Sequence, residues 1–474
     1  MRSGLKILVA VVVGYIFGRF ISLGPYIFWM LPIILGISFL FPIIGVIGWI
    51  ISEIFLGNYQ IFGANPRTFI AFAFAFYFLI RELIIHKGKN LKAISGFIKI
   101  PLIILMVGIM INIFLNTPFT NYFRWIVTFL SNISTVIFLG LFIKDEKILK
   151  KVVNIFIFIL GINALVGIFQ YIGIEQAYTI RQYLTKVEIY AHQGRVLGLS
   201  RTCIEYAYVL QLGFALLLGL LFWQDKKRRI ERIFLYISIW IIGIALILNG
   251  TRSAIGGIVL SILFYTFFDK KLLGEKIYTP KRIFAIFFVI LVLGFSTFSI
   301  LKMLGLEYIL SPRQILLKDP SAIGRIPRVK LALNVFIHHP LGVGGWNNYV
   351  EKINFYWKNL GISRGIYWNE FSVHNHFLRT FVYYGIVGGI LFILYILKLL
   401  KTCIVNYKNA AFSNYLKGVF LGGAIFIVAY CFNIFFHNAG PLAGDNLFWF
   451  WVGIIVSGIN IVKNKKYIYE RSNN

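Results

Sequence analysis

Apolar runs of about 20 residues recur along the whole chain, and short breaks rich in charged residues, glycine or proline separate them. One such run could be a buried helix, but a long series with charged breaks predicts repeated membrane crossings. By the length criterion the chain has about 12 to 14 spans, and about 14 would keep both chain ends on the same side. We therefore predict an all-α fold, a polytopic bundle of transmembrane helices.

The number of spans depends on residues 25–55, where Pro42 splits a long apolar run. Proline can kink a helix or end it, so this run is either a close-packed hairpin or one kinked helix. The first apolar run begins at Leu5, and no small-residue cleavage site follows it. We interpret this run as a retained first helix and not as a removed signal peptide.

Basic residues are concentrated in some of the breaks, and they predict the orientation of the chain. Cytoplasmic loops of membrane proteins are enriched in Lys and Arg, so the basic clusters and both chain ends are expected in the cytoplasm. The clusters lie at residues 2–6, 86–92, 144–151, 226–229, 270–282, 398–408 and 463–466. Alternation of the spans then places these segments on the outer face: 57–67, 116–121, 173–201, 249–252, 303–374 and 437–445.

The same alternation divides the chain into membrane and outer parts. We expect N-terminal membrane helices at 1–172, an outer loop at 173–203, central membrane helices at 204–302 with an outer turn at 249–252, a large periplasmic loop at 303–376, and C-terminal membrane helices with a short cytoplasmic tail at 377–474. In the large loop, residues 326–338 mix polar and apolar positions at helical spacing, which predicts an amphipathic helix. A turn rich in Pro and Gly follows at 339–345 and should end this helix.

Composition supports the membrane interpretation and limits the partners. Hydrophobic residues make up 59% of the 474-residue chain and charged residues 14%, whereas about a quarter of the residues are charged in soluble domains. The formal net charge is +30, and the basic residues behind it are concentrated in the breaks between spans. No basic groove, zinc motif or stacking platform accompanies them. We therefore expect the lipid bilayer as a partner and no nucleic acid. The three cysteines show no paired spacing, so neither disulfides nor a metal site is indicated.

Polar residues at the predicted ends of spans are the candidates for chemistry. His374, Asn375 and His376 open the apolar run that begins near residue 377. Because Asn is a strong helix N-cap, a purely structural role beside two interfacial histidines is the alternative here. Arg325 and Arg328 begin the predicted amphipathic helix.

Two further arginines lie in predicted outer segments where the charge rule expects few cations. Arg252 occupies the short turn at 249–252, and Arg195 lies in the loop at 173–201 together with Arg181, Lys186 and Arg201. An anionic partner would account for them. Contacts with lipid headgroups, or pairing with Glu175 and Glu188, would account for them equally well.

A histidine with several arginines on one face suits transfer from a phosphate-linked donor. The planar guanidinium group binds phosphate oxygens and neutralises a diphosphate leaving group, and a neutral imidazole can take a proton from an acceptor hydroxyl. The predicted outer face has no Asp-x-Asp pair and no His/Glu cluster with metal spacing. We therefore expect a reaction without metal or cofactor, in which arginine supplies the positive charge.

The spacing of these residues is itself informative. His-Asn at 374–375 is followed by nine residues and then by Gly-Ile-Val-Gly at 385–388, where the two glycines would permit close helix packing. Upstream, Gly-Arg at 324–325 leads to His-Pro-Leu-Gly-Val-Gly at 339–344, and the turn at 249–254 reads Asn-Gly-Thr-Arg-Ser-Ala. In this order the motifs resemble those of the O-antigen ligase/O-antigen polymerase family of bacterial membrane glycan transferases.

The resemblance implies a glycosyltransferase that uses an undecaprenyl-diphosphate-linked glycan as donor. It implies that His374 is the catalytic residue and that Arg252 and Arg325 bind the diphosphate, and we group Arg195, Arg328 and Asn375 with the substrate-binding residues. The acceptor would be lipid A-core in a ligase, which we favour, or a second glycan chain in a polymerase, and some relatives glycosylate proteins. The expected location is the bacterial inner membrane, with the active site on the periplasmic face.

Two other classes of protein are alternatives to a glycosyltransferase. A flippase for lipid-linked oligosaccharides would need ionisable residues near the middle of the membrane and broken helices in matching halves, whereas the charges here lie at the ends of spans. A structural assembly partner would need no converging set of histidine and arginines.

Overall fold

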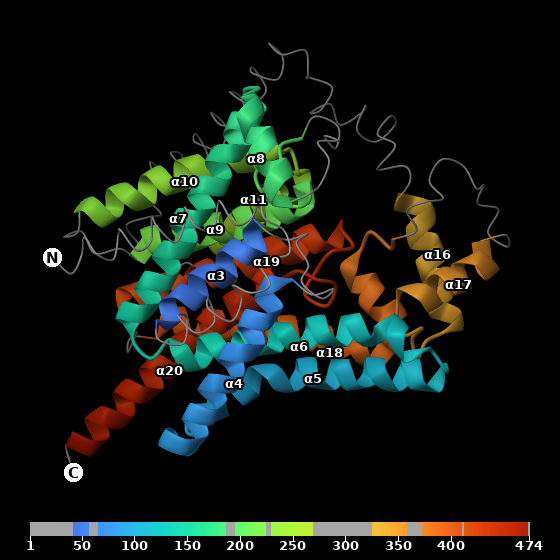
Figure 1. Ribbon diagram of the computed structural model, residues 1–474, viewed down its shortest axis with the longest axis horizontal. Coiled ribbons are helices and arrows are strands. Elements are labelled where there is room, and N and C mark those ends of the chain that lie inside the picture. Colours follow the sequence, from blue (N-terminus) through green and yellow to red (C-terminus); the bar gives the residue numbers. More distant parts are fainter. Residues whose placement is uncertain are drawn as a thin grey trace.

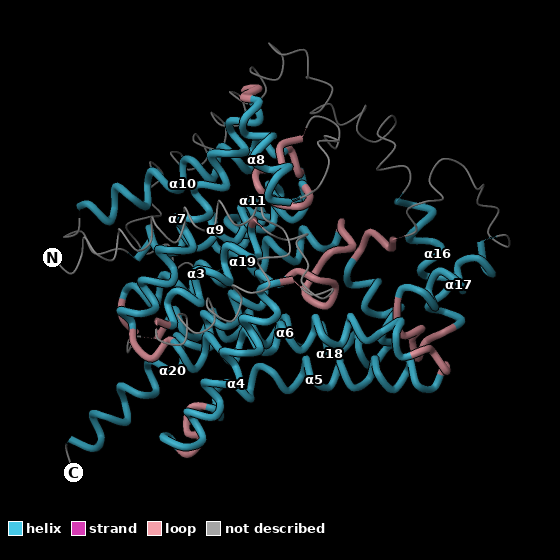
Figure 2. Tube along the Cα trace, in the orientation of Figure 1, coloured by secondary structure: helices cyan, strands magenta, loops and turns pink. Residues whose placement is uncertain are grey.

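The computed structural model describes residues 41–55, 65–185, 195–223, 229–268, 325–357, 372–409 and 412–472. Within these ranges the regular elements are α-helices (Figures 1 and 2). They are α3 (Pro42–Ile54), α4 (Pro66–His86), α5 (Leu91–Phe114), α6 (Phe119–Phe142), α7 (Glu146–Tyr171), α8 (Glu175–Thr185), α9 (Cys203–Trp223), α10 (Arg229–Asn249), α11 (Arg252–Phe268), α16 (Arg325–His338), α17 (Trp346–Tyr356), α18 (His376–Lys408), α19 (Asn414–Phe435) and α20 (Asn446–Ser472).

The helices form a polytopic membrane bundle, as the hydropathy pattern predicts. Among the described residues, 9 helices are long and apolar enough to cross a membrane: α4 to α7, α9, α10 and α18 to α20. Helices α3 and α11 are apolar but shorter. The remaining predicted spans fall before residue 41 and between residues 269 and 324, outside the described part of the chain.

Pro42 begins a helix. It is the first residue of α3, where its missing N–H leaves no hydrogen bond unmade, and the preceding Phe41 has non-helical dihedral angles. The start of α3 at Pro42 agrees with a break in the apolar run at this residue. The part of the run before residue 41 lies outside the described residues.

Helices α9 and α19 pack backbone against backbone at the centre of the bundle (Figure 1). A Cβ atom added to Gly219 of α9 would lie 2.3 Å from the carbonyl oxygen of Gly418 on α19. Small residues allow membrane helices to approach this closely, and dispersion contacts then hold the pair together. Helix α19 also packs against α11 and α18, so it connects the elements that carry the candidate site.

Helix α18 is broken near its start, and a loop docks into the break. Gly385 has φ 66° and ψ −171° inside the helix. The loop after α16 supplies hydrogen-bond partners there: the amide nitrogen of Val343 donates to Val382 (2.9 Å), that of Gly344 donates to Tyr383 (2.8 Å), and Ile386 donates to Pro340 (2.9 Å). Irregular backbone at membrane depth persists only where protein or water satisfies its polar groups, and here the loop does so.

This docking corrects the expectation for Gly385, which was predicted to serve helix packing together with Gly388. A Cβ atom on Gly385 would lie 2.4 Å from the backbone of Leu341, and one on Gly342, which has φ 97°, would lie 2.6 Å from the amide nitrogen of Gly385. The two glycine motifs recognised in the sequence therefore face each other. Gly385 makes room for a loop and not for a helix.

Helices α16 and α17 lie together at the end of the molecule opposite the C-terminal end of α20 (Figure 1). Helix α16 is the amphipathic helix predicted at 326–338, and it buries Leu331, Ala332 and Val335. Helix α17 was not predicted, and neither was α8. The loop before α17 is tied to α5, because the Asn112 Nδ2 atom donates to the carbonyl oxygen of Gly344 (3.0 Å).

Candidate functional site

His374 lies in the turn that begins α18. Asn375 caps the helix by accepting from the amide nitrogen of Leu378 (2.9 Å), and His374 itself has a positive φ of 49°. Such a φ is uncommon outside glycine and is found at turns and functional sites. Within the described residues, neither ring nitrogen of His374 has a hydrogen-bond partner, although both are buried. The imidazole is therefore held in place by the backbone and remains available to a ligand.

Arg325 and Arg328 place positive charge beside this ring. They lie one turn apart on α16, so they share a face of the helix. Burial, together with the nearby Arg328 and Arg325 guanidinium groups, lowers the pKa of His374 to about 4. The imidazole is therefore neutral at physiological pH and can accept a proton or a hydrogen bond.

A second histidine, His437, belongs to the same group of charges. It follows the end of α19, and burial, Arg325, His374 and Arg195 lower its pKa to about 3, in that order of effect. Arg325 thus acts on both histidines. We call His374, His437, Arg195, Arg325 and Arg328 the histidine–arginine cluster.

Ser253 connects His437 to α11. The Ser253 Oγ atom donates to Asn433 Oδ1 (2.7 Å) and lies 2.9 Å from His437 Nε2. Arg252, the first residue of α11, is adjacent to Ser253. The backbone of Arg252 therefore lies next to the residue that contacts His437.

Arg195 is positioned by a network of buried amide side chains. Asn249 Nδ2 donates to the carbonyl oxygens of Val196 (2.9 Å) and Cys203 (3.1 Å), and Gln170 Oε1 accepts from the amide nitrogen of Gly198 (2.9 Å). These bonds tie the described start of the Arg195 segment to α10 and α7. Arg195 therefore enters the cluster from a loop with a fixed backbone.

Two other cations of that predicted loop have structural roles. Arg181 is buried and donates from Nε to the carbonyl oxygen of Ser200 (3.2 Å) and from Nη2 to that of Arg201 (3.1 Å). Arg201 pairs with Glu205, a partner that the sequence did not suggest. Lys186 and Glu188 lie outside the described residues. The excess of positive charge in this loop is thus partly accounted for without a substrate.

The predicted site residues are therefore brought together to different degrees. Arg325 and Arg328 act electrostatically on His374, Arg325 and Arg195 act on His437, and Arg252 precedes Ser253, which contacts His437. The Oδ1 atom of Asn375 caps a helix, so its predicted role in substrate binding stays a prediction.

Sequence reasoning missed His437 and its partners Ser253, Asn433 and Gln211. Two signals were present. His437 begins a segment predicted to lie on the outer face, and Gln211 and Asn433 are polar residues inside apolar spans, where polar side chains mark functional or structural contacts. Neither signal indicates that these residues contact one another, because Ser253 and His437 are 184 positions apart in the sequence.

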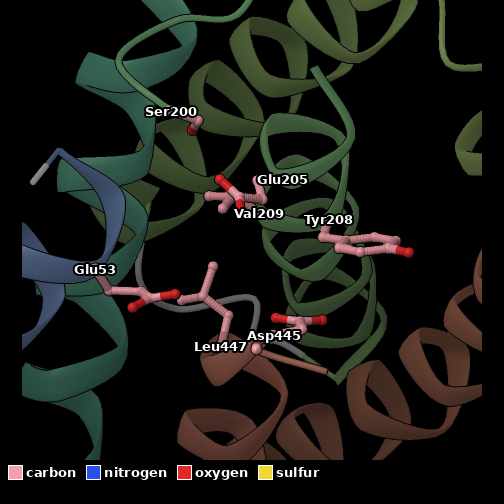
Figure 3. A pocket seen from close by; sticks show the side chains of 8 residues that line it. Glu53, Ser200, Glu205, Tyr208, Val209, Asp445 and Leu447 are labelled. Carbon is pink, nitrogen blue, oxygen red and sulfur yellow. The ribbon is translucent and has the colours of Figure 1, made fainter. Parts of the chain in front are cut away.

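A small acidic pocket, lined in part by Tyr208, lies on the side of His437 that faces this tyrosine. Figure 3 shows the side chains of Glu53, Glu205 and Asp445 pointing toward the space between α3, α9 and the start of α20. Burial raises the pKa of Asp445 to about 6, and Tyr430 donates a hydrogen bond to its carboxylate. The rings of Tyr208 and His437 meet edge to face with centroids 6.5 Å apart, so the pocket adjoins the cluster.

The fold and this geometry define a multi-pass helical membrane protein with a histidine–arginine site at the ends of its spans. Residues 237–393, roughly a third of the chain, match the family model described as O-Antigen ligase. The match confirms the resemblance found in the sequence and indicates a membrane glycan transferase of the O-antigen ligase/polymerase type. The matched region includes all predicted site residues except Arg195. No curated protein matches the chain.

Proposed function

We propose that this protein transfers a glycan from undecaprenyl diphosphate to an acceptor hydroxyl on the periplasmic face of the bacterial inner membrane. The observation that carries the proposal is the environment of His374. Its two ring nitrogens are buried, have no hydrogen-bond partner among the described residues, and lie near the charges of Arg325 and Arg328 within the region that matches the ligase family. A neutral base next to fixed positive charge is what attack on a diphosphate-linked sugar needs.

The proposed reaction is a displacement at the anomeric carbon of the donor sugar. The acceptor hydroxyl oxygen forms the new bond to that carbon, while the bond between the carbon and the diphosphate oxygen breaks. The departing undecaprenyl diphosphate keeps the electron pair, and a nitrogen of His374 takes the hydroxyl proton. Arg325 and Arg328 stabilise the negative charge that grows on the leaving oxygen. Arg195 and Arg252 add positive charge around the same diphosphate.

The acceptor separates two versions of this function. We favour a ligase that transfers the glycan to lipid A-core, because the histidine motif is the clearest sequence match. The alternative is a polymerase that joins lipid-linked repeat units into an O-antigen or exopolysaccharide chain. Both versions use the same donor, and therefore the same cluster around His374.

The test is reconstitution of the purified protein in lipid vesicles with undecaprenyl-diphosphate-linked glycan, first alone and then with lipid A-core. Transfer only after lipid A-core is added supports the ligase, and chain growth from the donor alone supports the polymerase. His374→Ala should abolish transfer in either case while the protein still inserts into the membrane. Full activity of that variant would remove His374 from the mechanism.

The same assay tests whether arginine replaces a metal ion. EDTA is expected to leave transfer intact, because the guanidinium groups provide the charge that a divalent cation would otherwise supply. Loss of activity in EDTA that Mg²⁺ restores would contradict this part of the proposal.

A further inference from the structure

A chain of directional hydrogen bonds fixes which nitrogen of His437 carries the proton. It starts at Gln211, whose Nε2 atom donates to the carbonyl oxygens of Ala254 (3.0 Å) and Ala429 (3.1 Å). Because carbonyl oxygens only accept, the Gln211 amide cannot be turned around, and its Oε1 atom must be the acceptor for the next residue. That residue is Asn433, which donates from Nδ2 to Gln211 Oε1 (3.3 Å).

The direction of these hydrogen bonds then fixes the direction of the bonds from Asn433 through Ser253 to His437. With Nδ2 of Asn433 committed to Gln211, its Oδ1 atom accepts from the hydroxyl of Ser253 (2.7 Å). The single hydroxyl proton of Ser253 is thereby used, so Ser253 Oγ can only accept from His437 Nε2, 2.9 Å away. His437 therefore carries its proton on Nε2, and Nδ1 presents a lone pair.

That lone pair has no partner in the described part of the chain. The His437 side chain is 5% exposed, and its Nδ1 atom is buried without a hydrogen bond. Ser253 holds the ring, and the loop after it is fixed because Tyr208 donates to the carbonyl oxygen of Ala439 (3.0 Å) and Arg379 to that of Asn438 (2.8 Å). A buried acceptor left unpaired is costly, so a rigid one at a candidate site indicates a donor group on the ligand.

The chemistry of the residues around His437 limits which hydrogen-bond donor the ligand can offer to Nδ1. Arg325 and Arg195, which act on His437, suit the oxygens of a diphosphate, but those oxygens carry no hydrogen to give to Nδ1. The hydrogen-bonded residues behind His437 end in neutral amides without a carboxylate, so these residues do not stabilise an imidazolium. His437 is thus built to accept a hydrogen bond and not to carry a proton away.

We propose that His437 Nδ1 accepts a hydrogen bond from a hydroxyl of the sugar attached to the lipid diphosphate, so that His437 positions the donor while His374 acts as the base. The inference rests on the proposed function, because it assumes a diphosphate-linked sugar in the cluster. It assigns the recognition of sugar and of diphosphate to different residues. The histidine recognises the sugar, and Arg325 recognises the diphosphate.

The test compares the binding of two probes to the purified full-length protein: undecaprenyl diphosphate, and undecaprenyl diphosphate carrying N-acetylglucosamine. His437→Gln keeps an amide near the position of Nε2, and with it the contact to Ser253, but removes the acceptor at Nδ1. It should weaken binding of the sugar-bearing probe about 3- to 10-fold and leave binding of the bare diphosphate unchanged. His437→Asn, whose amide lies near the position of Nδ1, should retain more of the sugar-dependent affinity.

Matched controls separate the possible failures. His338→Gln changes an exposed histidine on α16 and should leave the affinity for both probes unchanged. Three results for His437→Gln would each overturn the assignment to the donor sugar. They are equally weakened binding of both probes, wild-type affinity for both probes, and an effect confined to the KM of the acceptor. Wild-type protein that binds neither probe would contradict the proposed function itself, and the inference with it.

Discussion

At the scale of single residues, the cluster depends on the shape of arginine as much as on its charge. Arg325 acts electrostatically on both His374 and His437, so its charge lies near both histidines. A guanidinium group can hold two phosphate oxygens at once, whereas an ammonium group is a point charge. We expect Arg325→Lys to lower kcat/KM about 10- to 100-fold in the reconstituted transfer assay. Arg124→Lys, at an exposed arginine of α6, is the matched control, and equal activity of the two variants would contradict the diphosphate role.

The depressed pKa of His374 predicts the pH dependence of transfer. Only the neutral imidazole can take a proton, and with a pKa of about 4 it stays neutral as the pH falls from 8 to about 5. The rate should therefore be nearly flat over that range and fall as the pH approaches 4. An unshifted histidine would lose half of its neutral form near pH 6.5. A pH profile of kcat in vesicles distinguishes the two, and a midpoint near 6.5 would show that His374 is not shielded as the structure indicates.

At the scale of elements, the docking of the 339–344 loop into the break of α18 controls the position of the site. His374 immediately precedes the N-cap of α18 and Arg325 begins α16, so the loop that joins α16 to the break fixes one relative to the other. Gly342→Ala should place a Cβ atom 2.6 Å from the amide nitrogen of Gly385 and force an unfavourable φ of 97°. We expect a loss of about 1–3 kcal/mol of stability and at least a tenfold loss of activity.

The neighbouring Gly345 provides the control for this prediction. Its φ is 177°, which any residue can adopt, and a Cβ atom there would meet nothing within 4 Å. Gly345→Ala should therefore keep the melting temperature and activity of the wild type in detergent. If Gly342→Ala matched it in both measurements, the loop would not be what holds the two helices in register.

The sequence predicts the elements well but not the contacts between them. Long apolar runs and basic breaks identify the spans, because both follow from the membrane as a solvent. Helix α8 and helix α17 are too short and too polar to stand out by hydropathy. The docking of residues 339–344 against Gly385, and the pairing of Ser253 with His437, join distant positions, and no local pattern encodes such pairs.

At the scale of the whole molecule, segments predicted on one side of the membrane contact one another. The turn between α10 and α11 binds the Arg195 segment through Asn249, and the turn between α5 and α6 binds α17, since Asn348 donates to Thr117 (2.8 Å). On the side predicted to be cytoplasmic, the Lys150 ammonium of the basic segment at 144–151 lies 4.9 Å from the centre of the Tyr415 ring at the start of α19. This arrangement fits the alternation inferred from charge, and it brings the histidine–arginine cluster to the side predicted to be periplasmic.

Cysteine labelling in intact cells tests that orientation directly. The Glu351 side chain on α17 is 74% exposed, and Lys408 is exposed at the other end of α18. Glu351→Cys should react with a membrane-impermeant maleimide that can reach the periplasm, whereas Lys408→Cys should react only after the inner membrane is permeabilised. The wild-type chain is the control, because Cys203 and Cys403 are buried and Cys431 is half-buried. The reverse pattern would put His374 in the cytoplasm, away from any acceptor on the outer face, and would contradict the proposed transfer reaction.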